Sequence, residues 1–303
     1  MEPFIISREE FPMSTACAAG MIPMAPKQDN YEIYYKEDVP YQIRGERTLY
    51  LQIISPIGLK EAVPCLVYIP GSAFHEQNVK ERVAQLSYFA QMGFVVAALE
   101  YRGSETALFP AQALDAKAGV RFMKEHAAEY GIDSENIILM GDSSGAHTAV
   151  MAAFSYGVSE VEEENNTSDK PIVKGVIDLY GPTNFLTMND EPSSQDHRTP
   201  DSPEGCEIGG KAVLEHPELV APTILANYVQ KDRNLPPLLM FHGTNDELVP
   251  FGQSCELSDA LTTAGKDVTF YQVFGAHHGG WEFWTKEVLE IEKQFIRRVC
   301  GII

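Results

Sequence analysis

The stretch LMGDSSGAHTA, residues 139–149, sets a serine, Ser143, between two glycines in the spacing Gly-x-Ser-x-Gly. It follows a β-rich run at 136–140 and precedes an apolar stretch at 144–154 that is typical of a helix. A strand that turns sharply into a helix can hold a serine at its tip in a strained conformation, provided that flanking glycines leave room for the turn. Ser143 is therefore the candidate nucleophile, with an ordinary structural turn as the alternative.

Outward from this turn, strand-like and helix-like segments alternate along the chain. Apolar runs typical of buried strands occur at 63–70, 94–101, 173–180, 236–243 and 268–274, after two predicted strands joined at Gly45. Helical patterns occur at 78–93, 111–130 and from 286 onward. Because strands separated by helices must run parallel with crossover connections, the pattern predicts an α/β fold: a mostly parallel central sheet with helices on both faces.

No linker and no internal repeat divides the 303 residues, so the chain is expected to form one domain, residues 1–303. Residues 1–30 form an N-terminal arm. Its apolar side chains, Phe4 and Ile22 among them, are expected to pack against the domain or a partner subunit. Residues 181–235 are helix-like from about 211 to 229 and are expected to form a cap or lid insertion at the carboxyl edge of the sheet.

A serine hydroxyl needs a base that accepts its proton and an acid that orients the base. The segment HGTNDELVP follows a predicted strand and contains Asp246, which is favoured over Glu247 because the latter is expected to be a solvated loop charge. The segment FGAHHGGWEF ends the last predicted strand and contains two bases, His277 and His278. Adjacent side chains of an extended segment point to opposite sides, so only one of the two histidines can face the serine.

These motifs resemble those of the α/β-hydrolase serine esterases, in particular the hormone-sensitive-lipase-like group and its bacterial sugar-ester relatives, the acetyl xylan and feruloyl esterases. The segments EYRGSETALFPAQALDA, DLYGPTNF and DSPEGCEIGG carry the resemblance further along the chain. It implies an α/β-hydrolase fold with a cap insertion and a structural ion pair between Arg102 and Asp115. The family's last motif, Gly-Ala-Gly-His-Gly, aligned with residues 275–279, implies that His278 is the base and that His277 stands where glycine is usual.

The loop PGSA departs from the His-Gly-Gly-Gly of many relatives. An oxyanion hole needs only backbone N–H groups, so the amides of Ser72, Ala73 and Ser144 are the expected donors. The added side chains are expected to narrow the space for the acyl and alcohol groups. His75 is a candidate substrate-binding residue because it lies just past this loop. Trp281 is another, because it lies close to the base and sugar rings stack on aromatic faces.

The remaining histidines are expected to have no chemical role. His242 precedes a glycine at a strand end and His147 follows the elbow on its helix, so both are expected to be structural. His126, His197 and His216 lie in segments that are expected to be exposed.

Composition limits the partners and the compartment. With 23 Lys and Arg against 43 Asp and Glu, the net charge of −20 argues against nucleic acid and anionic membranes as partners. Five cysteines without a C-x-x-C pair indicate reduced thiols rather than disulfides or a zinc site. The first residues are acidic where a signal peptide is positive, so a cytoplasmic location is expected and the glycosylation sequons in NNTS, 165–168, would be without meaning.

The expected function is that of a serine carboxylesterase for short-chain acyl esters, with acetylated sugars as candidate substrates. No metal and no organic cofactor is expected, and the expected partner is a small-molecule ester, with homo-oligomerisation left open. A serine peptidase on the same fold is one alternative, although such enzymes usually carry a large extra domain. A non-catalytic binding protein with a hydrolase fold is the other, against which the full set of Ser, Asp and His argues.

Overall fold

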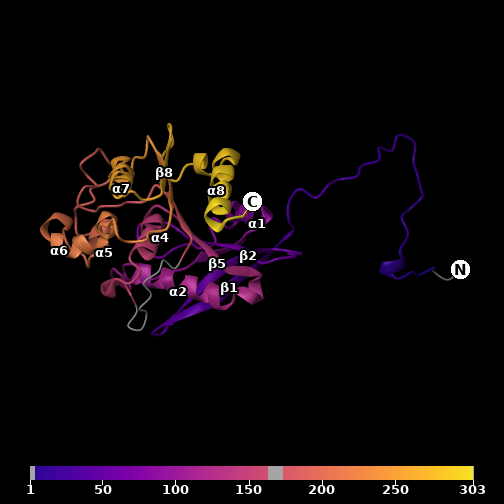
Figure 1. Cartoon of the computed structure of the whole chain (residues 1–303), viewed down its shortest axis with the longest axis horizontal. Helices are drawn as coiled ribbons and strands as arrows, with labels where there is room; N and C mark the ends of the chain where they lie inside the picture. Colours follow the sequence, from indigo (N-terminus) through magenta and orange to yellow (C-terminus); the bar gives the residue numbers. More distant parts are fainter. Residues whose placement is uncertain (1–3, 163–172, 303) are drawn as a thin grey trace.

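A central sheet of eight strands organises the computed structural model, which describes residues 4–162 and 173–302 and so leaves the sequons at 165–168 outside the described part. The strands are β1 Ile33–Arg44, β2 Arg47–Pro56, β3 Val63–Ile69, β4 Val95–Leu99, β5 Ile132–Asp142, β6 Gly175–Leu179, β7 Leu238–Gly243 and β8 Val268–Val273, in the order β1-β2-β4-β3-β5-β6-β7-β8 (Figure 1). The pairs β1 with β2 and β2 with β4 are antiparallel, and all other neighbours are parallel. The predicted mostly parallel sheet is confirmed.

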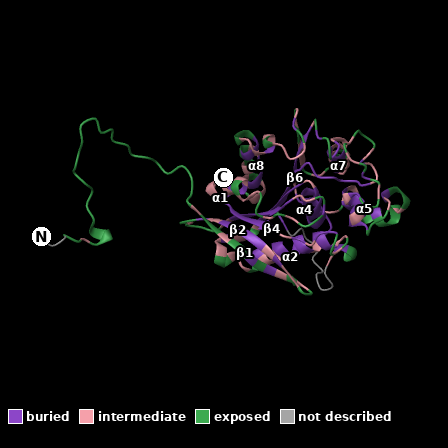
Figure 2. Ribbon diagram, turned by 180° about the vertical axis from the view of Figure 1, so that it is seen from behind, coloured by how far each residue is buried: buried purple, intermediate pink, exposed green. Residues whose placement is uncertain are grey.

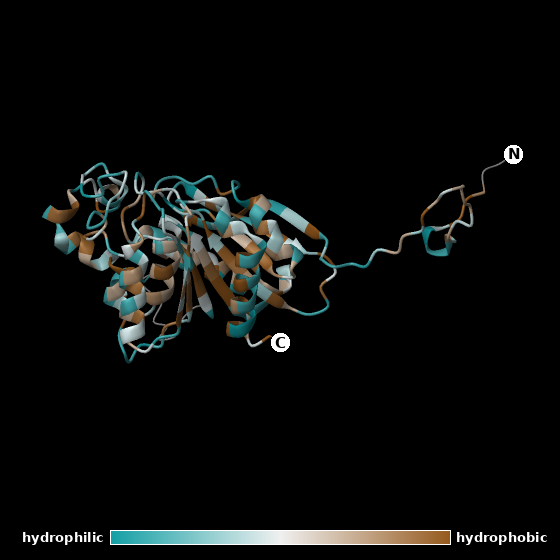
Figure 3. Cartoon of the chain, turned by 90° about the horizontal axis from the view of Figure 1, so that it is seen from above, coloured by the Kyte–Doolittle hydropathy of each residue, from teal (hydrophilic) through white to brown (hydrophobic). Residues whose placement is uncertain are grey.

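Helices cover both faces of this sheet. The main ones are α1 Val83–Gln91, α2 Ala111–Glu125, α4 Ser144–Phe154, α7 Gly252–Thr263 and α8 Lys286–Cys300, and the short α3 Ala127–Tyr130 and the 3₁₀ turn Ser159–Val161 follow α2 and α4. Side chains of β3 alternate between two cores: Val67 packs in the core that α2, α4 and α7 share, and Leu66 packs in the core that α1 and α8 share. Figure 3 shows the apolar strands enclosed between these helices.

A buried ion pair joins the loop after β4 to α2. The Asp115 side chain is fully buried and accepts hydrogen bonds from Nε and Nη2 of Arg102, at 2.7 and 2.9 Å, and from Nε of Arg44 on β1 at 2.8 Å. Two guanidinium groups therefore balance the one buried carboxylate, as a charge without water requires. The ion pair that the resemblance implies is confirmed.

The segment between β6 and β7 has a small apolar core of its own. Phe185, Ile208, Val213 and Val220 of this insertion pack with Phe74, which lies in the loop after β3. After α5, Pro203–Glu207, the helix expected over 211–229 is absent. In its place are single turns: Val213–Glu215, α6 Pro217–Val220, Ala221–Thr223 and Leu225–Tyr228. The prolines that begin or interrupt these turns lack the N–H that a continuous helix needs, which is why that prediction was wrong.

The N-terminal arm leaves the domain as an extended chain (Figures 1 and 2). Its apolar side chains lie in solvent, with Phe4 91% and Ile22 88% exposed, and Arg8–Glu10 form its one described helical turn. Contact with the domain begins at Tyr31, whose N–H donates to the carbonyl of Gln91 at 3.0 Å. The expectation that the arm packs on its own domain is wrong, because prolines and glycine interrupt the segment and leave it no continuous apolar face. Packing on a partner subunit stays a prediction.

Deletion of residues 1–27 is expected to leave the Tm of the domain unchanged within about 2 °C, because nearly all of residues 4–27 are exposed. Differential scanning fluorimetry of the full chain and the truncated chain measures this directly. A fall of more than about 5 °C at constant assembly state would show that the arm packs on its own domain. Light scattering on the same samples tests the remaining alternative, since loss of an oligomer on deletion would assign the arm to a partner subunit.

Candidate active site

Ser143 lies at the turn between β5 and α4, with φ 52° and ψ −128°. A positive φ is strained for a residue that has a Cβ, and the Ser143 N–H is fixed by donation to the carbonyl of Leu179 at 2.9 Å. A Cβ on Gly141 would collide with the carbonyl oxygen of Gly145, and one on Gly145 would collide with that of Ile69 in β3. Backbone packing therefore requires both glycines, and the predicted strand-to-helix elbow is present.

Three of the predicted side chains form one chain of hydrogen bonds at the carboxyl ends of the strands. His278 Nε2 lies 2.9 Å from Ser143 Oγ, and His278 Nδ1 lies 2.7 Å from Asp246 Oδ2. The Asp246 side chain is fully buried and that of His278 is 13% exposed. A carboxylate only accepts, so Nδ1 carries the proton that is donated to Asp246, and Nε2 is left to accept from the serine hydroxyl.

The two rival residues lie outside this chain of hydrogen bonds. His277 Nδ1 lies 3.1 Å from Glu247 Oε2, and the two side chains are 64% and 51% exposed. The adjacent histidines thus face different partners: His278 faces the serine, and His277 faces a solvated carboxylate.

The buried carboxylate of Asp246 is surrounded by four hydrogen-bond donors. Its Oδ1 accepts from the N–H groups of Leu248 and Val249 at 3.0 and 2.9 Å, and its Oδ2 lies 3.3 Å from Nε2 of His242 as well as near His278. Burial raises the pKa of the Asp246 carboxyl, but hydrogen bonds from His242 and His278 outweigh it and lower the pKa to about 2. The carboxylate is therefore ionised at every pH above about 3 and keeps the imidazole in one tautomer.

His242 is fully buried and has the structural role expected of it. Its Nδ1 lies 2.7 Å from Ser254 Oγ, and its Nε2 lies 2.9 Å from the carbonyl oxygen of Val249. Because that carbonyl only accepts, Nε2 carries a proton, which it shares with Asp246.

The loop after β3 approaches the elbow closely. The Gly71 N–H donates to Asp142 Oδ1 at 2.8 Å, and the Ser72 N–H donates to Ser144 Oγ at 2.9 Å. The Ser72 amide is thus already engaged. The amides of Ala73 and Ser144 donate no hydrogen bond to any residue that the structure describes. Ala73 has φ 54°, a strained value for a residue with a side chain.

The two predicted substrate-binding residues lie at the surface of the loops beside the site. His75 Nδ1 lies 3.4 Å from Glu105 Oε2 and 3.3 Å from Ser104 Oγ. Trp281 begins the 3₁₀ turn Trp281–Trp284, three positions after His278, and is 75% exposed. Neither makes a hydrogen bond to the serine, the base or the acid, so both stay predictions.

Sequence reasoning missed Tyr180, which follows β6. It is fully buried with φ 49°, and its ring centroid lies 4.8 Å from that of His278, edge to face. Its hydroxyl lies 3.4 Å from Asp142 Oδ2, and Tyr68 donates to Asp142 Oδ1 at 2.5 Å. Tyr180 therefore forms a floor beneath the base. In the sequence it stands at the end of an apolar run, where the pattern indicates only core packing.

A family model covers most of the residues that build this site. The model described as BD-FAE matches residues 51–261, which include the loop after β3, the elbow and Asp246. The chain belongs to the BD-FAE family. His278 lies beyond the matched residues, so its place in the site rests on the geometry above.

Relatives of this BD-FAE chain include esterases. Esterase LipQ of Mycobacterium tuberculosis is 26% identical over 80% of this chain and 56% of its own length, and the chain spans about half the length of the curated relatives it matches. A truncated carbohydrate esterase from gut microbiota superposes with a TM-score of 0.78 at 28% identity, over 91% of this chain and 99% of that one. The Est2 esterase of Thermogutta terrifontis, at 23% identity and a TM-score of 0.68 over 90% and 96%, shows the shared fold. The BD-FAE chain has the α/β-hydrolase fold.

One histidine of the BD-FAE chain is placed differently from the prediction. His197, expected to be exposed, is buried: its Nδ1 lies 2.9 Å from Glu204 Oε2, and its Nε2 lies 2.9 Å from the carbonyl oxygen of Leu248. The insertion thereby folds back onto the loop that carries Asp246, a long-range contact that a local exposure estimate does not contain. Its role is structural. His126 and His216 are partly exposed.

His147 behaves as expected of a structural group. Its Nδ1 lies 3.0 Å from the carbonyl oxygen of Pro182, and burial lowers its pKa to about 4. The neutral ring is thus an N–H donor that fixes the start of the insertion.

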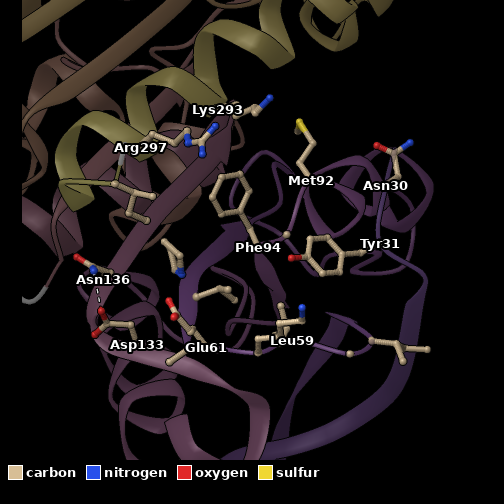
Figure 4. Close-up of a pocket in the computed structure, with 18 of the residues that line it drawn as sticks. Asn30, Tyr31, Leu59, Glu61, Met92, Phe94, Asp133, Asn136, Lys293 and Arg297 are labelled. Atoms are coloured by element: carbon tan, nitrogen blue, oxygen red, sulfur yellow. Dashed lines mark hydrogen bonds between the residues drawn. The ribbon is translucent and has the colours of Figure 1, made fainter. Parts of the chain in front are cut away.

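A separate cavity of about 910 Å³ lies at the amino ends of the parallel strands, away from the carboxyl ends that carry Ser143 (Figure 4). Residues from the amino ends of β3 and β4 line it, with Tyr31 and Phe94 as its aromatic side chains and Lys293 at its rim. Asp133 and Asn136 hydrogen bond to each other across 2.8 Å at one side. Ser143 follows the carboxyl end of β5, so this cavity is not the site of the serine chemistry.

The described residues of the BD-FAE chain contain no group of three or more His, Cys, Asp or Glu side chains arranged to hold a metal ion. Within the same part of the chain, every helix is too short or too polar to traverse a bilayer.

Proposed function

We propose that this BD-FAE chain is a serine carboxylesterase that hydrolyses short-chain acyl esters, acetylated sugars among them, through Ser143, His278 and Asp246. The observation that carries the proposal is the unbroken line of hydrogen bonds from Ser143 Oγ through His278 to Asp246, 2.9 and 2.7 Å long, at a strained elbow. No other arrangement of the candidate residues offers a nucleophile, a base and an acid in contact.

The reaction begins with Ser143. Its hydroxyl attacks the ester carbonyl while His278 Nε2 accepts the proton, and Asp246 stabilises the imidazolium that forms. The imidazolium returns the proton to the departing alcohol, which leaves an acyl group on Ser143. Water, deprotonated by the same nitrogen, attacks the acyl-enzyme and releases the acid.

The negative charge of each tetrahedral intermediate needs donors in place beforehand. The amides of Ala73 and Ser144 are unused by the described residues, and Ser144 is the first residue of α4, where the helix dipole favours negative charge. Each donor is worth on the order of 3 kcal/mol of transition-state stabilisation in a comparable hydrolase. The Ser72 amide, occupied by Ser144 Oγ, becomes a third donor only if that bond opens.

The carbohydrate part of the proposal rests on the gut carbohydrate esterase that superposes on nearly the whole domain. A panel of acetylated mono- and disaccharides beside simple alkyl acetates tests it. Faster turnover of the sugar acetates supports the proposal, and exclusive turnover of the alkyl acetates contradicts it.

The serine mechanism is tested by covalent labelling. A fluorophosphonate is expected to react with one residue per chain, to abolish turnover of p-nitrophenyl acetate in proportion, and to increase the mass of the peptide that contains Ser143. Labelling at another residue with full loss of turnover would refute the assignment, and undiminished turnover after stoichiometric labelling of Ser143 would do the same.

Acyl-chain selectivity is expected to favour acetyl esters. We expect the side chains that Ser72 and Ala73 carry in place of glycine to narrow the space beside the carbonyl site, so kcat/KM for p-nitrophenyl acetate is expected to exceed that for the octanoate by at least about tenfold. Ala73→Gly, which removes a Cβ and suits the φ of 54°, is expected to reduce this ratio. A kcat/KM that rises steadily from acetyl to octanoyl would overturn the prediction.

A further inference from the structure

Arg82 stands directly before α1, at the end of the loop that contains the oxyanion amides. It is half-buried, yet its guanidinium makes no hydrogen bond and has no carboxylate within 4.0 Å among the described residues. Two other cations near the same loops are paired: Lys80 with Asp38 at 2.9 Å, and Arg102 with Asp115. All five N–H donors of Arg82 are therefore available.

This guanidinium lies beside the base. The nearest atoms to a Cβ built on Gly279, the residue after His278, are Arg82 Nη2 at 3.8 Å and the Tyr180 hydroxyl at 4.0 Å. The Tyr180 ring in turn packs on His278. Because residue 279 is glycine, with φ 70°, it places no side chain of its own between the loop of the base and the guanidinium.

Trp284 contacts the guanidinium. The Arg82 Cζ lies 5.9 Å from the centroid of the Trp284 ring, a cation–π contact. The indole N–H of Trp284 is itself buried and has no acceptor among the described residues. Arg82 and Trp284 therefore both carry N–H groups without an acceptor among the described residues.

Arg82 has no hydrogen-bonded or ion-paired carboxylate among the described residues, although Asp142 and Glu81 act on it electrostatically from farther away. Such a half-buried cation is unusual in a chain of net charge −20, where carboxylates are abundant. We propose that Arg82 binds a carboxylate carried by the ester substrate, so that the enzyme prefers anionic esters, such as acetylated acidic sugars, over neutral ones. This inference rests on the proposed function and names its substrate class. A planar guanidinium is suited to a carboxylate because the two make paired, charge-assisted hydrogen bonds.

The contact acts on the ground state and the transition state alike, because the carboxylate is distant from the reacting bond and does not change charge. Such uniform binding lowers KM and leaves kcat unchanged. Loss of Arg82 is therefore expected to appear in KM for anionic esters alone.

Matched pairs of substrates test the proposal. In the first pair, 4-acetoxybenzoate carries a carboxylate on the alcohol side of the ester, and 4-acetoxybenzamide carries a neutral amide in its place. In the second pair, the 4-nitrophenyl monoester of succinate carries a carboxylate on the acyl side, and the 4-nitrophenyl ester of succinamate carries a neutral amide there. In at least one pair, wild type is expected to show a KM about 10- to 100-fold lower for the carboxylate, the effect of a hydrogen bond to a charged group. The pair in which this occurs identifies the side that faces Arg82.

Arg82→Gln is expected to remove that preference while kcat and the neutral member of the pair change less than about twofold, and Arg82→Lys is expected to retain part of it. Lys80→Gln, which removes a paired cation from the same loop, is the matched control and is expected to keep the preference. Equal KM values for both members in wild type overturn the inference without any variant. So does an equal loss on both members in Arg82→Gln, which would make Arg82 a support for the loop of the base.

The same assay separates the two proposals. If wild type hydrolyses the ester bond of the neutral substrates just as well as that of the carboxylate substrates, the serine esterase proposal stands and the Arg82 inference fails. If wild type hydrolyses no member of either pair, both fail.

Discussion

Ser143→Ala is expected to lower kcat/KM for p-nitrophenyl acetate by about 10⁴- to 10⁶-fold, while the Tm stays within about 2 °C of wild type. The loss is large because, among the described residues, Ser143 carries the one hydroxyl that hydrogen bonds to His278, and what remains is the contribution of the oxyanion amides and of binding. The fold is expected to persist because alanine keeps the Cβ and loses only the hydroxyl of a partly buried side chain. Stopped-flow or steady-state assays with thermal denaturation of the same preparation measure both quantities.

Ser144→Ala is the matched control, since it removes the adjacent hydroxyl and keeps Ser143. Its Oγ accepts a hydrogen bond from the Ser72 amide, so a loss of less than about tenfold is expected. An inactive Ser144→Ala beside an active Ser143→Ala would mean that the motif is misassigned by one residue.

His278→Ala is expected to lose about 10⁴-fold or more in kcat, because no other base in the described part of the chain lies within hydrogen-bond distance of Ser143 Oγ. His277→Ala is expected to lose less than about tenfold, because its side chain is largely exposed and pairs with Glu247. Both variants are measured at one pH, in parallel with wild type.

Adjacent histidines make this comparison sharp, since the two substitutions are chemically identical and one residue apart. The reverse order, with His277→Ala inactive and His278→Ala active, would move the base to His277 and require a different conformation of the loop. Equal losses in both variants would indicate that the loop itself had been disturbed.

Short sequence motifs and the alternation of strands and helices predicted the features that depend on local backbone conformation. The elbow could be predicted because backbone packing at Gly141 and Gly145 admits no side chain, and this restriction is visible as a motif. The parallel sheet followed from the alternation of strands and helices. The proximity of Asp246 and the histidine pair to Ser143 followed from loops at the carboxyl ends of strands that share one sheet, and the choice of His278 over His277 came from the resemblance to the family motif.

What could not be predicted depends on contacts between distant segments. Tyr180 adopts its strained φ beneath His278, and His197 becomes buried against the loop of Asp246, through packing that no periodicity encodes. The engagement of the Ser72 amide by Ser144 Oγ likewise requires the relative position of two loops. The expectation that the arm packs on its own domain failed for the opposite reason: its apolar composition indicates packing, but prolines interrupt the segment and leave no continuous face toward the domain.

The separation of the serine and its base along the chain has a consequence for folding kinetics. Ser143 and His278 are 135 residues apart, and they belong to a central strand and to the loop after the edge strand β8. Contacts of such long sequence separation form late, after local helices and the inner strands. Recovery of ester turnover after dilution from denaturant is therefore expected to lag the recovery of far-ultraviolet circular dichroism, so that activity reports when the last strand has docked.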